Sequence, residues 1–247
     1  MAPVSIVLFP SFSMIEAKDS SALPQAFNRA IKYTALFIIP IAILVSGLSD
    51  PFILLIYGEE YQFASIYLKL LALTYLFSPL TMVAITYFNG VGLNIETLKT
   101  RAIYFLIVLI LAPILTMYLR VIGGVIALLM ASILTATYSL YTCYKLKLPI
   151  DIKYLSKIYV SSLASIAIAS TISLSLNSTS LIMNFTNLLI SGLIYVFLLS
   201  LIMSLLNIPT NQDIQFIKKY FGNIKLIGPL VSLLTRYFEF IKGFIPR

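Results

Sequence analysis

The chain has 247 residues, of which 60% are hydrophobic and only 11% are charged, against roughly 25% charged in ordinary globular domains. This composition excludes a water-soluble fold of this size, because it cannot supply enough polar surface. The sequence has no His and one Cys, Cys143, which excludes a His-based triad, a Cys/His zinc site and an intrachain disulfide. The net charge of +8 does not indicate nucleic-acid binding, because the Lys and Arg residues lie in short loops between apolar runs.

The first thirty residues predict the end of one helix and a short interfacial helix. Residues 3–9 are apolar but too short to cross a membrane, and Pro10 is expected to end this stub. Pro24 suits the first turn of a new helix. The apolar residues between Leu23 and Ile31 follow one helical face, which predicts an amphipathic helix lying in the membrane interface.

Six apolar runs then approach the length of about 20 residues that crosses a hydrocarbon core. We expect helices, because an isolated helix satisfies its own backbone hydrogen bonds in lipid. A tail rich in both apolar and basic residues follows and is predicted to lie on the membrane surface as an amphipathic element. The predicted spans cover residues 31–57, 64–88, 102–119, 121–144, 158–176 and 187–206.

The basic residues predict how these spans are oriented. Of the 17 Lys and Arg residues, all but Lys69 and Arg120 fall on one side of the predicted membrane. The positive-inside rule places that side, and with it both termini, in the cytoplasm. An odd number of spans would break this partition, so the charges favour six. The chain is therefore predicted to be a multi-pass protein of the cell membrane.

Two charged residues lie deep within apolar sequence and are candidates for an intramembrane ion pair. Asp50 lies nine residues before Glu59, and Lys69 lies nine residues after Glu60. In an antiparallel helix pair the two would sit at similar depth, where an ion pair could gate a pathway or bind a ligand. The alternative is structural: Asp50 precedes Pro51 and can cap a restarted helix, and Lys69 can extend to the membrane surface.

Small residues in the fourth span predict close contact between helices. Gly123, Ala127, Ala131 and Thr135 recur every four residues, and Gly124 widens this smooth helix-packing stripe. Proline occurs inside three of the spans and is expected to kink them: Pro40, Pro79 and Pro113.

Several local patterns follow one another in a characteristic order and spacing. They are Phe9–Ser13, Pro40, Asp50–Pro51, Tyr57–Tyr61, Leu68–Ala72, Asn89–Gly92 and Gly123–Ala127. Together they are similar to the C-terminal half of polysaccharide-biosynthesis flippases, including the O-antigen and lipid II types of the multidrug/oligosaccharidyl-lipid/polysaccharide exporter superfamily. The resemblance implies a two-lobe transporter of about fourteen spans, with a lipid-linked saccharide entering the cleft between the lobes. The family's cationic residues that meet the substrate lie largely in the other half, so none is carried over.

The resemblance also suggests how the chain is divided. Residues 1–145 would form a partial C-terminal lobe, made of the helix stub, the interfacial helix and four spans. Residues 146–207 would add two spans, and residues 208–247 the cytoplasmic tail. Because alternating access needs two bodies around one site, we expect a partner to supply the other wall. That partner would be a separately encoded first half or a second copy of this chain.

The leading hypothesis is therefore an all-α flippase component that moves lipid-linked saccharides across the lipid bilayer during cell-surface polysaccharide or glycan synthesis. One alternative is a cation-coupled drug or solute antiporter of the same superfamily, for which Asp50 is the candidate carboxylate. Another is a non-transporting remnant or assembly protein. The sequence contains no Gly-rich phosphate loop, metal-ligand cluster or paired nucleophile and base, so we expect neither an enzyme nor a bound cofactor or metal.

Overall fold

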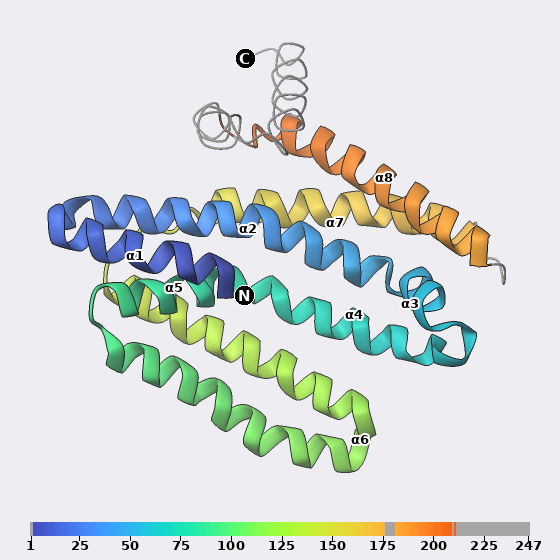
Figure 1. The fold of residues 1–247 in the computed structure, drawn as a ribbon, viewed down its shortest axis with the longest axis horizontal. Helices are drawn as coiled ribbons and strands as arrows, with labels where there is room; N and C mark the ends of the chain where they lie inside the picture. Colours follow the sequence, from blue (N-terminus) through green and yellow to red (C-terminus); the bar gives the residue numbers. More distant parts are fainter. Residues whose placement is uncertain (1, 176–180, 209, 211–247) are drawn as a thin grey trace.

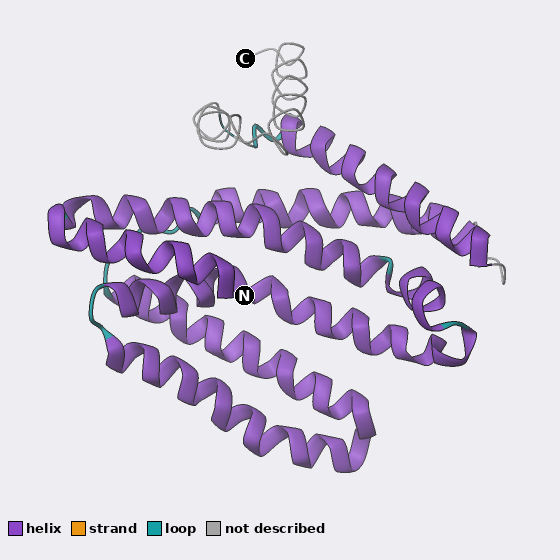
Figure 2. Cartoon of the chain, in the orientation of Figure 1, coloured by secondary structure: helices purple, strands orange, loops and turns teal. Residues whose placement is uncertain are grey.

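The computed structural model describes residues 2–175, 181–208 and 210, and all the regular structure within them is helical (Figure 2). Five helical stretches in this part are long and apolar enough to cross a membrane. The elements are α1 (Ala2–Lys18), η1 (Ser20–Ala22), α2 (Leu23–Gly47), α3 (Ser49–Tyr57), η2 (Glu59–Ala64), α4 (Ser65–Thr74), η3 (Tyr75–Phe77), α5 (Ser78–Gly90), α6 (Asn94–Lys145), α7 (Ile152–Ser175) and α8 (Leu181–Leu205).

The longest element, α6, supplies two of the membrane passes. Its 52 residues would extend for about 78 Å as one straight helix, more than twice the roughly 30 Å hydrocarbon core. Arg120 breaks it with φ 53° and ψ −139°. There the helix doubles back on itself as a hairpin (Figure 1). The five stretches therefore give six passes, which confirms the multi-pass helical fold expected from the sequence.

The N-terminal prediction was wrong in two respects. The first helix does not stop at Pro10 but continues through it to Lys18. The predicted interfacial helix is not a separate element either, because its residues form the first turns of the 25-residue α2. Its apolar stripe faces protein, not a membrane surface: Phe27 and Ile31 are buried against α1 and α5. The sequence cannot separate the two cases, because an apolar stripe has the same spacing whether the helix packs against protein or lies in the membrane interface.

Two other span boundaries differ from the prediction, and the predicted tail is not tested. The first predicted span, residues 31–57, is divided, because α2 ends at Gly47 and the chain bends at Leu48 before α3 begins. The last span begins at Leu181 rather than at residue 187. The predicted tail, from residue 208 onward, lies almost entirely outside the described residues.

Aromatic residues pack α1 against α2 and α5 near the end of the bundle that carries most of the basic loops. Phe12 and Phe27 each meet the ring of Tyr87 edge to face, at centroid distances of 5.5 Å and 5.1 Å. Such a pair contributes roughly 0.5–1.5 kcal/mol beyond the area that it buries. The contact requires Gly90 on α5, where a Cβ atom would lie only 2.8 Å from the Cβ atom of Phe12.

The α7–α8 pair joins this body through α2. At one end, Lys32 on α2 forms a 2.7 Å ion pair with Asp151 and lies over the Tyr154 ring, 4.6 Å from its centroid. Deeper in the bundle, the Tyr195 hydroxyl on α8 donates a 2.9 Å hydrogen bond to the carbonyl oxygen of Pro40. Small buried side chains on α7 allow close packing along the seam; they are Ser161, Ser162 and Ser165.

Candidate functional site

A half-open cavity of about 570 Å³ lies between α1, the α4–α5 segment and the two arms of α6. Its walls combine aromatic rings, hydroxyl groups and a guanidinium group. Six Ser and Thr residues, from α1, the α4–α5 segment and the second arm of α6, line the cavity. They are Ser5, Thr74, Ser78, Thr81, Ser132 and Thr135.

One wall of the cavity is a broken helix. The α-helix stops at Thr74, three residues of 3₁₀-helix follow, and α5 begins at Ser78 with Pro79 in its first turn. Pro79 has no N–H to donate to the carbonyl four residues before it, that of Tyr75, so the helical hydrogen-bond pattern is interrupted here. Transporters place such discontinuous helices at substrate sites near the membrane midplane.

Side-chain hydroxyls donate hydrogen bonds to the backbone carbonyls at this break. Ser78 Oγ donates a 2.8 Å hydrogen bond to the Tyr75 carbonyl, and the Tyr159 hydroxyl on α7 donates a 2.6 Å bond to the Leu76 carbonyl. Such bonds allow a helix to be interrupted within a membrane, because no backbone acceptor is left without a donor. The bond from Tyr159 also ties the break to α7.

Arg101 is the one charged residue that lines the cavity in the part of the chain that the structure describes. It lies on the first arm of α6 and is exposed. The ion pairs of the described residues involve other cations, so no carboxylate neutralises this guanidinium. Arg presents several N–H donors in a rigid fork that matches a carboxylate or phosphate group. The cavity is therefore suited to an anionic group.

Thr135 supplies a second polar group on the opposite arm of α6. Its side chain is only 3% exposed, and its Oγ1 atom has no hydrogen-bond partner. The other wall hydroxyls differ, because Ser132 and Thr81 donate to backbone carbonyls of their own helices. An unpaired buried hydroxyl costs about 1–3 kcal/mol. This Oγ1 atom is itself fully buried, so a ligand in the cavity would reach it only after neighbouring side chains moved.

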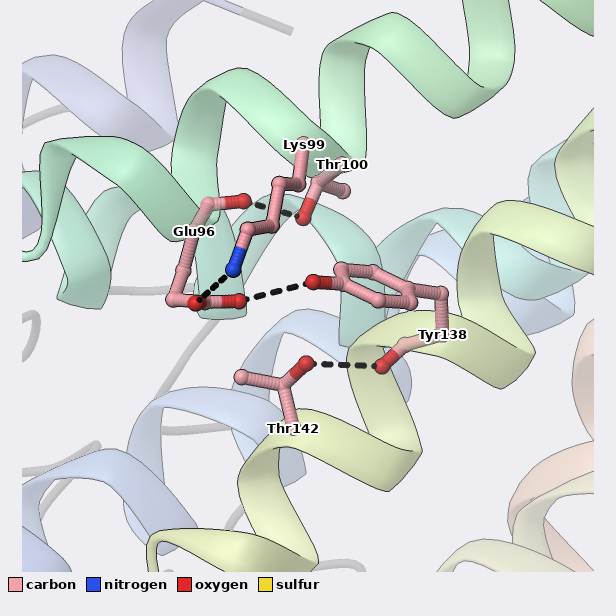
Figure 3. A network of polar contacts seen from close by, with 5 residues as sticks. All are labelled: Glu96, Lys99, Thr100, Tyr138 and Thr142. Atoms are coloured by element: carbon pink, nitrogen blue, oxygen red, sulfur yellow. Dashed lines mark hydrogen bonds and ion pairs between the residues drawn. The ribbon is translucent and has the colours of Figure 1, made fainter.

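A polar network fixes the two arms of α6 beside the cavity (Figure 3). The Tyr138 hydroxyl donates a 2.7 Å hydrogen bond to Glu96 Oε2, although 42 residues separate the two in sequence. Lys99 Nζ donates to the other carboxylate oxygen, Oε1, at 2.8 Å. Thr135 lies about one turn from Tyr138, and Arg101 about one turn from Glu96. The network therefore holds the arginine and the threonine at similar depth.

The structure brings the sequence-predicted ion pair together, but away from the cavity. Lys69 Nζ lies 3.8 Å from Asp50 Oδ2, at the long end of the ion-pair range, and both side chains are about 40% exposed or more. Ser46 Oγ donates to the Lys69 carbonyl at 3.3 Å. Asp50 does not cap α3, because the N-cap residue is Leu48. Asp50 lies within the first turn, where its negative charge interacts favourably with the positive end of the helix dipole.

The predicted helix-packing stripe falls on the second arm of α6. Ala127 and Ala131 are fully buried. A Cβ atom on Gly123 would overlap the backbone of Leu115 on the first arm, whereas one on Gly124 would lie 3.4 Å from Thr116 Oγ1. The stripe thus packs the hairpin against itself and, at Thr135, reaches the cavity.

Sequence reasoning did not identify the cavity residues. Arg101 was interpreted as one of several loop cations and Thr135 as part of a smooth stripe. A usable signal was present, because Pro79 follows Thr74 and Ser78 inside an apolar run. Hydroxyl residues beside an intramembrane proline indicate a place where the backbone needs side-chain donors.

Comparison with known proteins supports the resemblance seen in the sequence. Residues 1–66 match the family model described as polysaccharide biosynthesis protein. The structure matches that of the lipid II flippase MurJ in an inward closed conformation, with a TM-score of 0.67 and 22% identity. The match covers 82% of this chain and 43% of that chain, so this chain spans less than half the length of the flippase. No curated protein matches the sequence.

These comparisons confirm that the chain resembles the polysaccharide-biosynthesis flippases and has the fold of a membrane transporter of the MurJ type. At 22% identity the structural match shows the fold and not the activity.

Proposed function

We propose that this chain is a transporter component that moves lipid-linked saccharides across the membrane, with the cavity beside Arg101 receiving the anionic head group. The observation that carries the proposal is the charge of this cavity: one unneutralised guanidinium and several hydroxyls, without a carboxylate among its lining residues. A diphosphate-linked sugar offers acidic oxygens to the guanidinium and hydroxyl groups to the threonines and serines. The family match and the fold are in keeping with such a substrate.

The same observation weighs against a cation-coupled antiporter. Such a transporter needs a carboxylate in its ion pathway, but Asp50 is paired with Lys69 and lies outside the cavity. The function is also proposed to be transport and not catalysis, since the cavity's lining offers positioning groups but no pairing of a nucleophile with a base.

We further propose that the chain works beside a partner, either a separately encoded half or a second copy. The chain corresponds to 43% of the solved flippase, and a half-open cavity gives substrate one wall of an alternating-access site. The basic loops lie at the cytoplasmic end in this proposal, following the positive-inside rule.

The test is export of lipid-linked saccharide in a strain that lacks the gene and is complemented with variants. Wild type and Lys153→Gln should restore export, because Lys153 is an exposed cation on α7 that does not line the cavity and forms no ion pair with the other described residues. Arg101→Gln should fail at equal protein level in the membrane. Normal export in the deletion strain, or equal rescue by all three proteins, would refute the proposal.

A further inference from the structure

Four aromatic side chains lie in ring-to-ring succession along the segment from α3 to α4. This segment lies at the end of the bundle opposite the connection between α1 and α2 (Figure 1). The centroid distances are 6.0 Å from Tyr57 to Tyr61, 6.4 Å from Tyr61 to Phe63, and 6.3 Å from Phe63 to Tyr67. We call Tyr57, Tyr61, Phe63 and Tyr67 the aromatic shelf. The shelf extends from the end of α3 through η2 into α4.

Most of this aromatic surface is free. Tyr57, Tyr61 and Phe63 are 60%, 50% and 63% exposed, although each ring already contacts another. Gly58 permits the arrangement, because its φ of +84° reverses the chain between the first ring and the other three. The shelf is thus built by a turn that places successive rings side by side, and not by a helix face that spaces them out.

In the sequence, residues with hydrogen-bond acceptors lie between the aromatic residues of the shelf. Glu59, Glu60 and Gln62 are all exposed, and in the described part of the chain neither carboxylate forms an ion pair. Unpaired carboxylates are unfavourable beside the phosphates of a lipid head-group layer, which counts against a purely lipid-anchoring role. Sugars suit this combination: their polarised C–H faces stack on the negative face of an aromatic ring, and their hydroxyls donate to carboxylates.

One side of the α4–η3 segment links the shelf to the cavity. Tyr67 and Leu71 on α4, and Tyr75 at the start of η3, recur every four residues and therefore follow one another along one side of this segment. Tyr67 belongs to the shelf, and Tyr75 lines the cavity. The rise of about 1.5 Å per residue separates these two residues by about 12 Å along the segment.

We propose that the aromatic shelf, with Glu59 and Glu60, is a saccharide-binding surface that holds the sugar portion of the substrate at this end of the bundle. Its place in transport rests on the proposed function, but sugar binding itself does not. The ligand class is a neutral oligosaccharide, recognised by stacking and by hydrogen bonds to the two carboxylates.

The test uses saturation-transfer NMR on the full chain in lipid nanodiscs. The probes are lipid-free tetrasaccharides of glucose, mannose and N-acetylglucosamine. We expect at least one to receive saturation at its ring C–H protons from wild-type protein. That signal should fall at least threefold in the double variant Tyr61→Ala/Phe63→Ala and in Glu59→Gln/Glu60→Gln.

Tyr118→Ala is the matched control, because Tyr118 is 82% exposed and lies beside the α6 turn, at the same end of the bundle. Its signal should equal that of wild type. No transfer to any probe, or equal transfer in all variants, would overturn the proposal and leave the rings as interfacial anchors. Because the probes carry no lipid or diphosphate, failure here leaves the export test of Arg101 unaffected, and failure of export leaves sugar binding measurable.

Discussion

Gly123 lies directly against the backbone of Leu115, so the two arms of α6 meet without a side chain between them just beyond the Arg120 turn. This contact closes the hairpin at one end, and the hydrogen bond from Tyr138 to Glu96 closes it at the other. The cavity residues on both arms depend on this fixed register.

Replacing Gly123 with Ala should destabilise the protein by about 1–3 kcal/mol, because the added Cβ atom overlaps main-chain atoms that cannot rotate away. The matched control is Gly124→Ala, whose Cβ atom would make an ordinary contact of 3.4 Å and should change stability by less than about 0.5 kcal/mol. Cys143, the one cysteine and fully buried, provides the measurement through its reaction with a thiol dye on heating. Equal melting temperatures for the two variants would contradict the hairpin packing.

Thr135→Val should raise the melting temperature of the protein. Valine has a similar shape but removes a buried hydroxyl that has no partner, which should stabilise the empty protein by about 1 kcal/mol. Thr142→Val on the same arm is the control, because its hydroxyl donates a 3.0 Å bond to the Tyr138 carbonyl and its loss should lower stability. A fall in melting temperature for Thr135→Val would show that this hydroxyl is satisfied in the empty protein.

The sequence predicted the membrane-crossing helices well, because span length and apolar composition are local properties. The prediction of an interfacial helix at Leu23–Ile31 was wrong, because the same apolar stripe suits either a membrane interface or the surface of α1 and α5 against which it packs. The sequence also did not reveal the residues that line the cavity, because their proximity depends on tertiary structure. Arg101 and Thr135 are 34 positions apart, and only the register of the α6 hairpin brings them to one wall.

The Lys32–Asp151 ion pair should stabilise the protein at neutral pH but not in acid. The hydrogen bond from Lys32 lowers the pKa of Asp151 below its usual value of about 3.9. A carboxylate with a depressed pKa contributes stability above its unfolded pKa and loses that contribution as pH falls through the folded value. The melting temperature of wild type should therefore exceed that of Asp151→Asn at pH 7, with the gap closing below about pH 4.

The size of that gap should be modest, because Asp151 is 37% exposed and exposed pairs contribute about 0–1 kcal/mol. Lys32→Met should lower the melting temperature at neutral pH in the same direction. A gap between wild type and Asp151→Asn that persisted unchanged at pH 3 would show that the stabilisation does not come from this charge.

Asp50→Asn should leave transport and its pH dependence nearly unchanged. The carboxylate is 45% exposed and 3.8 Å from Lys69, so it makes a weak pair outside the cavity. A double-mutant cycle with Lys69→Met should give a coupling free energy below about 1 kcal/mol. Loss of proton- or sodium-driven efflux in Asp50→Asn would instead favour a cation-coupled antiporter.

The most direct test of the account is binding of a short-chain prenyl diphosphate saccharide to the purified full-length protein, measured by calorimetry in nanodiscs. The account predicts that Arg101→Gln weakens binding at least tenfold, equivalent to about 1.4 kcal/mol, while Lys153→Gln binds like wild type. Equal affinity of Arg101→Gln and wild type would contradict the assignment of this cavity to the anionic head group.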